Sequence, residues 1–153
     1  MTETDLPADR ANRIADAVEA IERDVTRLRE YQHLSRAEYS APGKQDRRDA
    51  IERKFEKLTQ ATLDIAAELC KQERSERYDR RKRQIDVLKA ESIVDSDLAD
   101  RLREAIAFRD VRAHTDGPIV NDDIVYDALQ NDLDRYVEFV SAVDEYLERY
   151  VES

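Results

Sequence analysis

The sequence is short of the residues that break or cross-link a chain. Its 153 residues include two glycines, three prolines, one cysteine and no tryptophan. So few glycines and prolines leave almost no turn signals, which excludes an all-β protein with its many tight turns. A single cysteine, Cys70, excludes an internal disulfide and agrees with a reducing cytoplasm. No apolar run approaches the length of about 18 residues that a transmembrane helix needs, so we expect no membrane span.

Charge is what the sequence has in abundance. Charged residues and apolar residues each make up 41% of the chain. This balance is typical of long amphipathic helices with one apolar stripe and a wide, solvent-exposed polar face. The length predicts a single helical domain over residues 1–153. The first residues, Met1–Asp9, are polar and acidic and lack the apolar stretch of a secretory signal, so we expect a cytoplasmic protein.

The net charge of −10 argues against nonspecific binding to nucleic acid, which needs a positive surface. High net charge also keeps proteins soluble in concentrated salt, so a halophilic host is a second explanation for the acidic composition. The acidic residues are densest from 121 to 153, where they are spread evenly rather than at ligand spacing. This favours a solvated face over a metal site. We therefore expect neither a metal nor a cofactor.

Apolar residues that recur every three or four positions predict four main helices. They are expected over about 7–32, 46–73, 96–114 and 121–150, with one or two short helices between them. The expected core stripes consist of Ile14, Val18, Ile21, Val25 and Leu28; Ile51, Phe55, Leu58, Thr62, Ile65 and Leu69; Leu98, Leu102, Ala105 and Ile106; and Val125, Leu129, Leu133, Val137, Val140 and Leu147. The predicted fold is all-α, a bundle of four to five helices.

Cap residues mark where several of these helices begin. Ser35 followed by Glu38 has the spacing of a capping box, which predicts a short helix there. Ser96 is expected to cap the third main helix, and Asn121 or Asp122 the last one.

A basic stretch interrupts the acidic trend between residues 71 and 89, where eight basic residues face four acidic ones. Its centre is the run Arg80, Arg81, Lys82 and Arg83. One interpretation is a solvated helix face with ion pairs between successive turns. The other is a phosphate-binding patch that contacts RNA.

Two residues that often carry chemistry are better explained here by structure. Cys70 lies at the edge of an apolar stripe with no histidine or metal ligand nearby, so we expect a small buried side chain. His33 lies at the end of the first helix between Gln32 and Leu34, with no acid or base partner in the sequence. A surface or capping role is expected for it.

His114 lies in the densest cluster of ionisable residues near a turn, just before a Gly-Pro break that ends a helix. Asp110 precedes it by four residues, so the two share a helix face and the carboxylate can orient the imidazole. Arg109 precedes it by five residues, about 140° around an ideal helix. One chain therefore offers half a site, and a two-fold dimer would bring the arginine and the histidine together.

The stretch from Phe108 to His114 resembles the motif of the HEPN superfamily: arginine, a polar residue, a short spacer and histidine. The surrounding sequence resembles the HepT-like branch, the toxins of toxin–antitoxin pairs whose antitoxin is a minimal nucleotidyltransferase. The stretches that carry this similarity are 50–55, 63–66, 98–102 and 124–133.

The resemblance implies a helical bundle that forms a homodimer and cleaves RNA without a metal or cofactor, under the control of a nucleotidyltransferase antitoxin. Arg109 and His114 would be the catalytic pair, with Asp110 orienting them. RNA brings its own nucleophile, the 2′-hydroxyl; a histidine moves protons and an arginine stabilises the charge that develops on phosphate oxygens. Arg112 and the basic run would contact RNA.

One position departs from the family pattern. HepT-like toxins commonly have a tyrosine two residues after the histidine, the target of AMP transfer by the antitoxin, and here this residue is Asp116. The next tyrosine is Tyr126. Three interpretations stay open: an RNA-cleaving toxin, a non-catalytic HEPN domain that binds a nucleotide or a nucleotidyltransferase partner, and a helical protein in which Arg109 and His114 only form an ion-paired helix end.

Overall fold

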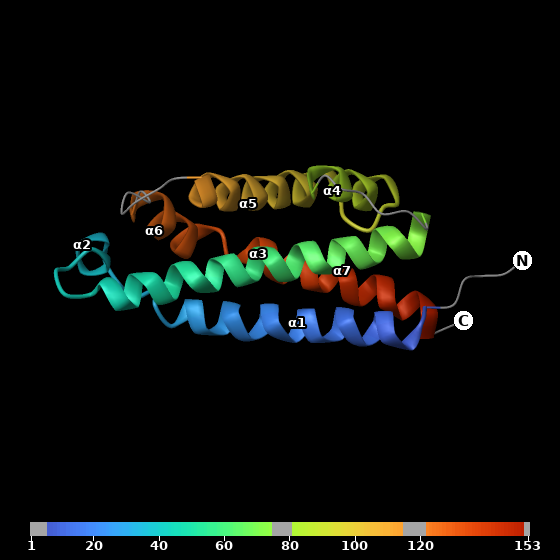
Figure 1. Ribbon diagram of the computed structural model, residues 1–153, viewed down its shortest axis with the longest axis horizontal. Coiled ribbons are helices and arrows are strands. Elements are labelled where there is room, and N and C mark those ends of the chain that lie inside the picture. The colour runs from blue at the N-terminus through green and yellow to red at the C-terminus, as the bar shows by residue number, and fades with distance from the viewer. Residues whose placement is uncertain (1–5, 75–80, 115–121, 152–153) are drawn as a thin grey trace, which may run out of the picture.

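Long amphipathic helices dominate the computed structural model, which describes residues 6–74, 81–114 and 122–151. It leaves out the side chains of residues 74, 81–82, 109–114 and 151. Helices are the only regular structure in these ranges, and they are α1 Ala8–Arg29, α2 Arg36–Tyr39, α3 Gln45–Arg74, α4 Arg81–Ala90, α5 Ser96–His114, α6 Asp122–Asn131 and α7 Asp134–Val151 (Figure 1). The predicted all-α class is confirmed.

The long helices α1, α3, α5 and α7 run lengthwise along an elongated bundle (Figure 1). Helix α3 is central, since it packs against α1, α4, α5 and α7. The short helices α2 and α6 meet at one end of the bundle, and α5 also ends there. Helix α1 begins and α7 ends at the opposite end. Within the described ranges, no helix has the length and apolar character needed to cross a membrane.

The core is a single cluster of side chains from all seven helices. The predicted stripes of the first three main helices are all buried, which confirms their register. Cys70 is also buried, and its thiol lies 3.6 Å from the carbonyl oxygen of Gln84, so the expected structural role is confirmed. His33 is exposed, and its Nδ1 lies 2.8 Å from the carbonyl oxygen of Glu30 in the turn after α1, as expected for a surface or capping residue.

The prediction of one continuous last helix is wrong, because the chain breaks at residues 132–133 into α6 and α7. Asn131, Asp132 and Asp134 surround the break, and such side chains favour helix ends over helix interiors. The break also changes the buried face. Val137, predicted in the core, is 43% exposed, whereas Tyr136 is 2% exposed.

Helix ends follow local hydrogen bonds. The predicted capping box is confirmed: Glu38 N donates to Ser35 Oγ (3.0 Å) and Ser35 N donates to Glu38 Oε1 (2.8 Å). The prediction for Ser96 is wrong by one residue. Asp95 caps α5, because its Oδ1 accepts from the backbone N–H of Leu98 at 2.7 Å.

The first helix ends before the predicted boundary at residue 32. Helix α1 stops at Arg29, and Gln32 instead bonds to α6: its side chain donates to the carbonyl of Leu129 (3.0 Å), and its carbonyl accepts from Gln130 (2.8 Å). The last main helix begins at Asp122, so the alternative cap Asn121 lies outside the described residues.

Helix α4, at the end of the basic stretch, stops in a Schellman motif. Ile93 N donates to the carbonyl of Leu88 (2.9 Å), and Ser92 N donates to that of Lys89 (3.0 Å). Ser92 has a φ of 60°, a left-handed backbone conformation that favours glycine. Ile93 is then buried, which anchors the short loop to α5.

We expect Ser92→Gly to raise the free energy of unfolding by about 1 kcal/mol, because glycine removes the steric penalty of the left-handed conformation. Chemical denaturation monitored by circular dichroism measures it. Ser92→Ala is the matched control and keeps the Cβ atom, so it gains nothing. A glycine variant less stable than wild type would contradict the prediction.

Candidate functional site

The candidate catalytic motif occupies the last part of α5, which is helical through His114. The side chains of Arg109, Asp110, Arg112 and His114 lie outside the described residues, as does Asp116. The backbone still defines their register. His114 follows Asp110 by about one helical turn, so these two positions share a side of the helix. The Cα atoms of Arg109 and His114 are about 140° apart around the helix axis.

In the register of α5, position 109 follows Leu102 by seven residues and Ala105 by four, so the three positions share one side of the helix. Leu102 and Ala105 are buried. His114 is on a different side of the same helix. A continuous helix therefore does not bring the two predicted catalytic residues of one chain onto one face.

One helical turn before the motif, the surface is hollowed into a pocket of about 330 Å³ between α3, α5, α6 and α7, here called the acidic pocket. Its apolar lining is formed by Phe55, Ala105, Phe108, Ile124, Ala128 and the ring of Tyr136. Its charged lining is formed by Glu104, Asp123, Asp127, Asp132 and Arg135. Four carboxylates and one guanidinium make the wall strongly acidic.

Phe108 is the last described side chain before the motif. Its ring meets that of Phe55 edge-on, with centroids 6.1 Å apart and an interplanar angle of 77°. Phe55 is 2% exposed, so this contact ties the end of α5 to the buried face of α3.

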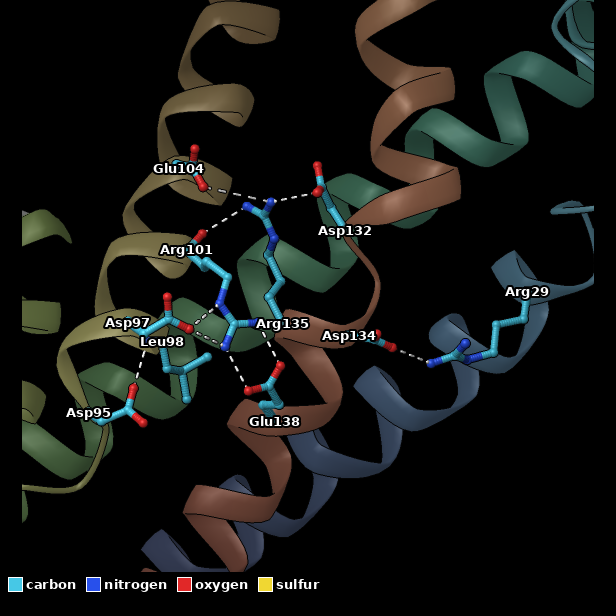
Figure 2. A network of polar contacts seen from close by, with 10 residues as sticks. All are labelled: Arg29, Asp95, Asp97, Leu98, Arg101, Glu104, Asp132, Asp134, Arg135 and Glu138. Carbon is cyan, nitrogen blue, oxygen red and sulfur yellow. Dashed lines mark hydrogen bonds and ion pairs between the residues drawn. The ribbon is translucent and has the colours of Figure 1, made fainter.

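Two arginines join α5 to α7 (Figure 2). The guanidinium of Arg101 donates to both carboxylate oxygens of Glu138 at 2.6 Å and also pairs with Asp97 at 2.9 Å. This two-pronged geometry is stronger and more directional than a single ion contact. The Arg101 guanidinium holds the pKa of the Glu138 carboxyl below its usual range, and the hydrogen bond to Glu138 raises the pKa of Arg101.

Arg135 makes the second connection from the first turn of α7. Its Nη1 donates to the backbone carbonyl of Arg101 at 2.8 Å, and its Nη2 lies 3.1 Å from Asp132 and 4.0 Å from Glu104 (Figure 2). Arg135 is 8% exposed, so its charge is buried at the base of the acidic pocket. The same residue thus joins the α6–α7 turn to α5.

The basic stretch is only partly described. Arg80 lies outside the described residues, and so do the side chains of Arg81 and Lys82. Arg83 is exposed on α4, which packs against α5 through an ion pair between Asp86 and Arg103. The described part agrees with a solvated face, and RNA binding by this stretch stays a prediction.

Comparison with known proteins gives the family. A family model described as "Ribonuclease HepT-like" matches residues 21–143. The chain belongs to the HepT-like family of HEPN domains. No curated protein matches it.

Solved structures share the fold. A mutant form of the MntA–HpeT toxin–antitoxin is 19% identical, with a TM-score of 0.71, 88% of this chain covered and 98% of that chain. The tri-AMPylated HEPN toxin of Shewanella oneidensis in complex with its MNT antitoxin is also 19% identical, with a TM-score of 0.69 and coverage of 87% and 97%. At this level of identity the likeness shows the fold of the HepT-like chain.

Tyr126 is the first tyrosine of the HepT-like chain after the motif. Its hydroxyl donates to the carbonyl of Leu34 at 2.7 Å, and its ring packs against that of Tyr39 with centroids 5.7 Å apart. It is therefore held in the contact between α6 and the segment before α2. A modifying enzyme would first have to break this hydrogen bond.

Sequence reasoning missed Arg135, the packing of Phe108 against Phe55 and the acidic pocket. One signal was available for Arg135, which is one of only two basic residues between positions 121 and 153. An arginine next to apolar positions in a helix that is otherwise acidic is a candidate for a buried ion pair. The pocket had no such signal, because its walls come from four helices.

We expect Arg135→Met to lower the free energy of unfolding by about 1–3 kcal/mol, because the carbonyl of Arg101 and the carboxylate of Asp132 lose their donor. Methionine preserves most of the buried volume, so chemical denaturation reports the lost polar contacts. Arg27→Met, at an exposed position of α1, is the control and should change stability by less than about 0.5 kcal/mol. Equal effects of the two substitutions would count against the role of Arg135.

The lowered pKa of Glu138 predicts a dependence of stability on pH. Its ion pair with Arg101 contributes fully above the ordinary glutamate pKa of about 4.3, and this contribution is lost as pH falls through the lower folded-state value. The difference in Tm between wild type and Glu138→Gln should therefore be largest near neutral pH and shrink on acidification. Differential scanning calorimetry across that range measures it, and a difference independent of pH would refute the assignment.

Proposed function

We propose that this HepT-like chain is the toxin of a toxin–antitoxin pair and cleaves RNA without a metal, using Arg109 and His114 in a homodimer. The observation that supports this most is the family match over residues 21–143, which contains the arginine–histidine motif at the end of α5. The solved structures that share the fold are toxins in complex with antitoxins, one of them named as a nucleotidyltransferase (MNT) antitoxin.

The chemistry needs only these side chains and the RNA. The neutral imidazole of His114 accepts the proton of the 2′-hydroxyl, whose oxygen attacks the adjacent phosphorus. Arg109 stabilises the charge on the non-bridging phosphate oxygens as the new P–O bond forms. The bond to the 5′-oxygen breaks, and the His114 imidazolium gives its proton to that oxygen, which leaves as a hydroxyl. Asp110, one turn before His114, fixes the tautomer of the ring.

The homodimer is part of the proposal because of the register of α5. Arg109 and His114 of one chain are on different sides of a continuous helix, so an arginine from one subunit and a histidine from the other would complete each site.

Neutralisation is proposed to be non-covalent. Asp116 replaces the tyrosine that the family pattern places after the histidine, and Tyr126 is held by its hydrogen bond to Leu34. The antitoxin would then act by covering the site.

The second candidate is a HEPN domain that binds a protein partner without cleaving RNA. The acidic pocket beside the motif favours it over nucleotide binding, since negative charge exceeds positive charge among the described residues that line it.

Purified protein incubated with RNA in EDTA tests cleavage directly. We expect His114→Ala and Arg109→Ala each to reduce the cleavage rate by at least about 100-fold. His33→Ala, which changes the only other histidine, is the matched control and should leave the rate unchanged. No cleavage by wild type, or full activity of His114→Ala, would overturn the proposal.

Mixing the two inactive variants tests the shared site. In a dimer of one Arg109→Ala and one His114→Ala subunit, one of the two composite sites is intact, so a randomised mixture should recover about a quarter of wild-type activity. Sites contained within one subunit would recover none.

A further inference from the structure

The acidic pocket is not explained by RNA cleavage. It lies one helical turn before the motif, yet among the described residues its charged lining consists of the acidic Glu104, Asp123, Asp127 and Asp132 and a single base, Arg135. Arg135 is already engaged with Asp132 and with the carbonyl of Arg101. Among these described residues negative charge is in excess, which favours a cationic ligand over a phosphate.

The carboxylates of the pocket are unequally neutralised. Asp123 pairs with Arg36 at 2.6 Å, and Asp132 pairs with Arg135 at 3.1 Å. Asp127 accepts a hydrogen bond from the uncharged amide of Asn131 at 2.8 Å and meets no cation among the residues that the structure describes. The pocket therefore retains capacity for a positive group at its α6 wall.

The rest of the pocket is apolar. Phe55, Ala105 and Ala128 are at most 7% exposed and form its floor, while Ile124 on the rim is 46% exposed. Ile124 is one of only two large hydrophobic side chains exposed to this degree among the described residues. An apolar floor with an acidic wall suits a ligand that has an aliphatic stem and a cationic head.

We propose that the acidic pocket receives an arginine side chain of a partner protein. A guanidinium matches the geometry of carboxylates and stacks on aromatic rings, and here both the carboxylate of Asp127 and the partly exposed ring of Phe108 line the pocket. The aliphatic part of that arginine, or an apolar neighbour of it, covers Ile124. The volume of about 330 Å³ is at the lower end of ligand pockets, as expected for a single side chain.

A second copy of the chain fits this pocket less well. A two-fold contact centred on it would set two acidic rims against each other, and the chain as a whole carries a net charge of −10. Identifying the partner as the antitoxin rests on the proposed function. The chemistry of the pocket does not.

The test is a titration of ¹⁵N-labelled protein with N-acetyl-arginine amide, followed by amide chemical shifts. We expect shifts localised to Ala105, Ala128 and their neighbours. N-acetyl-citrulline amide has nearly the same shape without the charge. Its affinity for the protein should be at most a tenth of that of the arginine amide. Asp127→Asn should weaken arginine binding by at least fivefold, and Glu145→Gln, at an exposed position of α7, should leave it unchanged.

Three results would overturn the proposal: no shifts at the pocket with the arginine amide, equal binding of the citrulline amide, or binding of AMP at the same amides. Sedimentation of Ile124→Asp adds a fourth, since conversion of a wild-type dimer to a monomer would assign this face to a second copy. Because no RNA is present, failure here leaves the cleavage experiment intact, and failure of cleavage leaves this titration valid.

Discussion

The guanidinium of Arg135 is the contact on which the arrangement at the motif end of the bundle depends. It lies in the first turn of α7, 8% exposed, and bonds to the backbone carbonyl of Arg101 in α5 and to Asp132 in the turn before α7. One buried charge thus links the turn between α6 and α7 to the backbone of α5. Buried ion pairs add little net stability, but they penalise alternative packings that would leave the charge without partners.

From that contact, support extends along α5 toward the motif. Arg101 of α5 donates two hydrogen bonds to Glu138 of α7. Nearer the end of α5, Phe108 packs edge-on against Phe55 of α3. The candidate catalytic residues therefore follow directly from a stretch of helix that is held to α3 and α7. A site on a supported helix keeps its geometry better than one on a loop.

Under the two proposals, the surface near the motif would meet two kinds of ligand with opposite charge. The protein carries a net charge of −10, so RNA would be attracted only locally, by the arginines of the motif and the basic stretch of residues 71–89. The acidic pocket next to the motif has the opposite preference. A partner seated there would lie beside the candidate catalytic residues. Occupancy of the pocket would then hinder access of RNA to the motif. This offers a route to inhibition that does not need a tyrosine at position 116.

The sequence by itself determined the helical class, the register of the first three main helices and the capping box at Ser35, because each depends on neighbours within one or two turns. It also carried the resemblance to the HepT-like family, which the family model over residues 21–143 confirms. Local signals were ambiguous at Asp95 and Ser96, since both are good caps, and at Asn131–Asp132, which tolerate either a helix or a turn. At the break between α6 and α7, Arg135 pairs locally with Asp132 and also donates to the backbone carbonyl of Arg101 in α5, a tertiary contact that the local sequence does not reveal. That break moved Tyr136 into the core and Val137 out of it. The acidic pocket was beyond sequence reasoning because its walls join Phe55, Glu104, Asp127 and Arg135, which only the packing of four helices brings together.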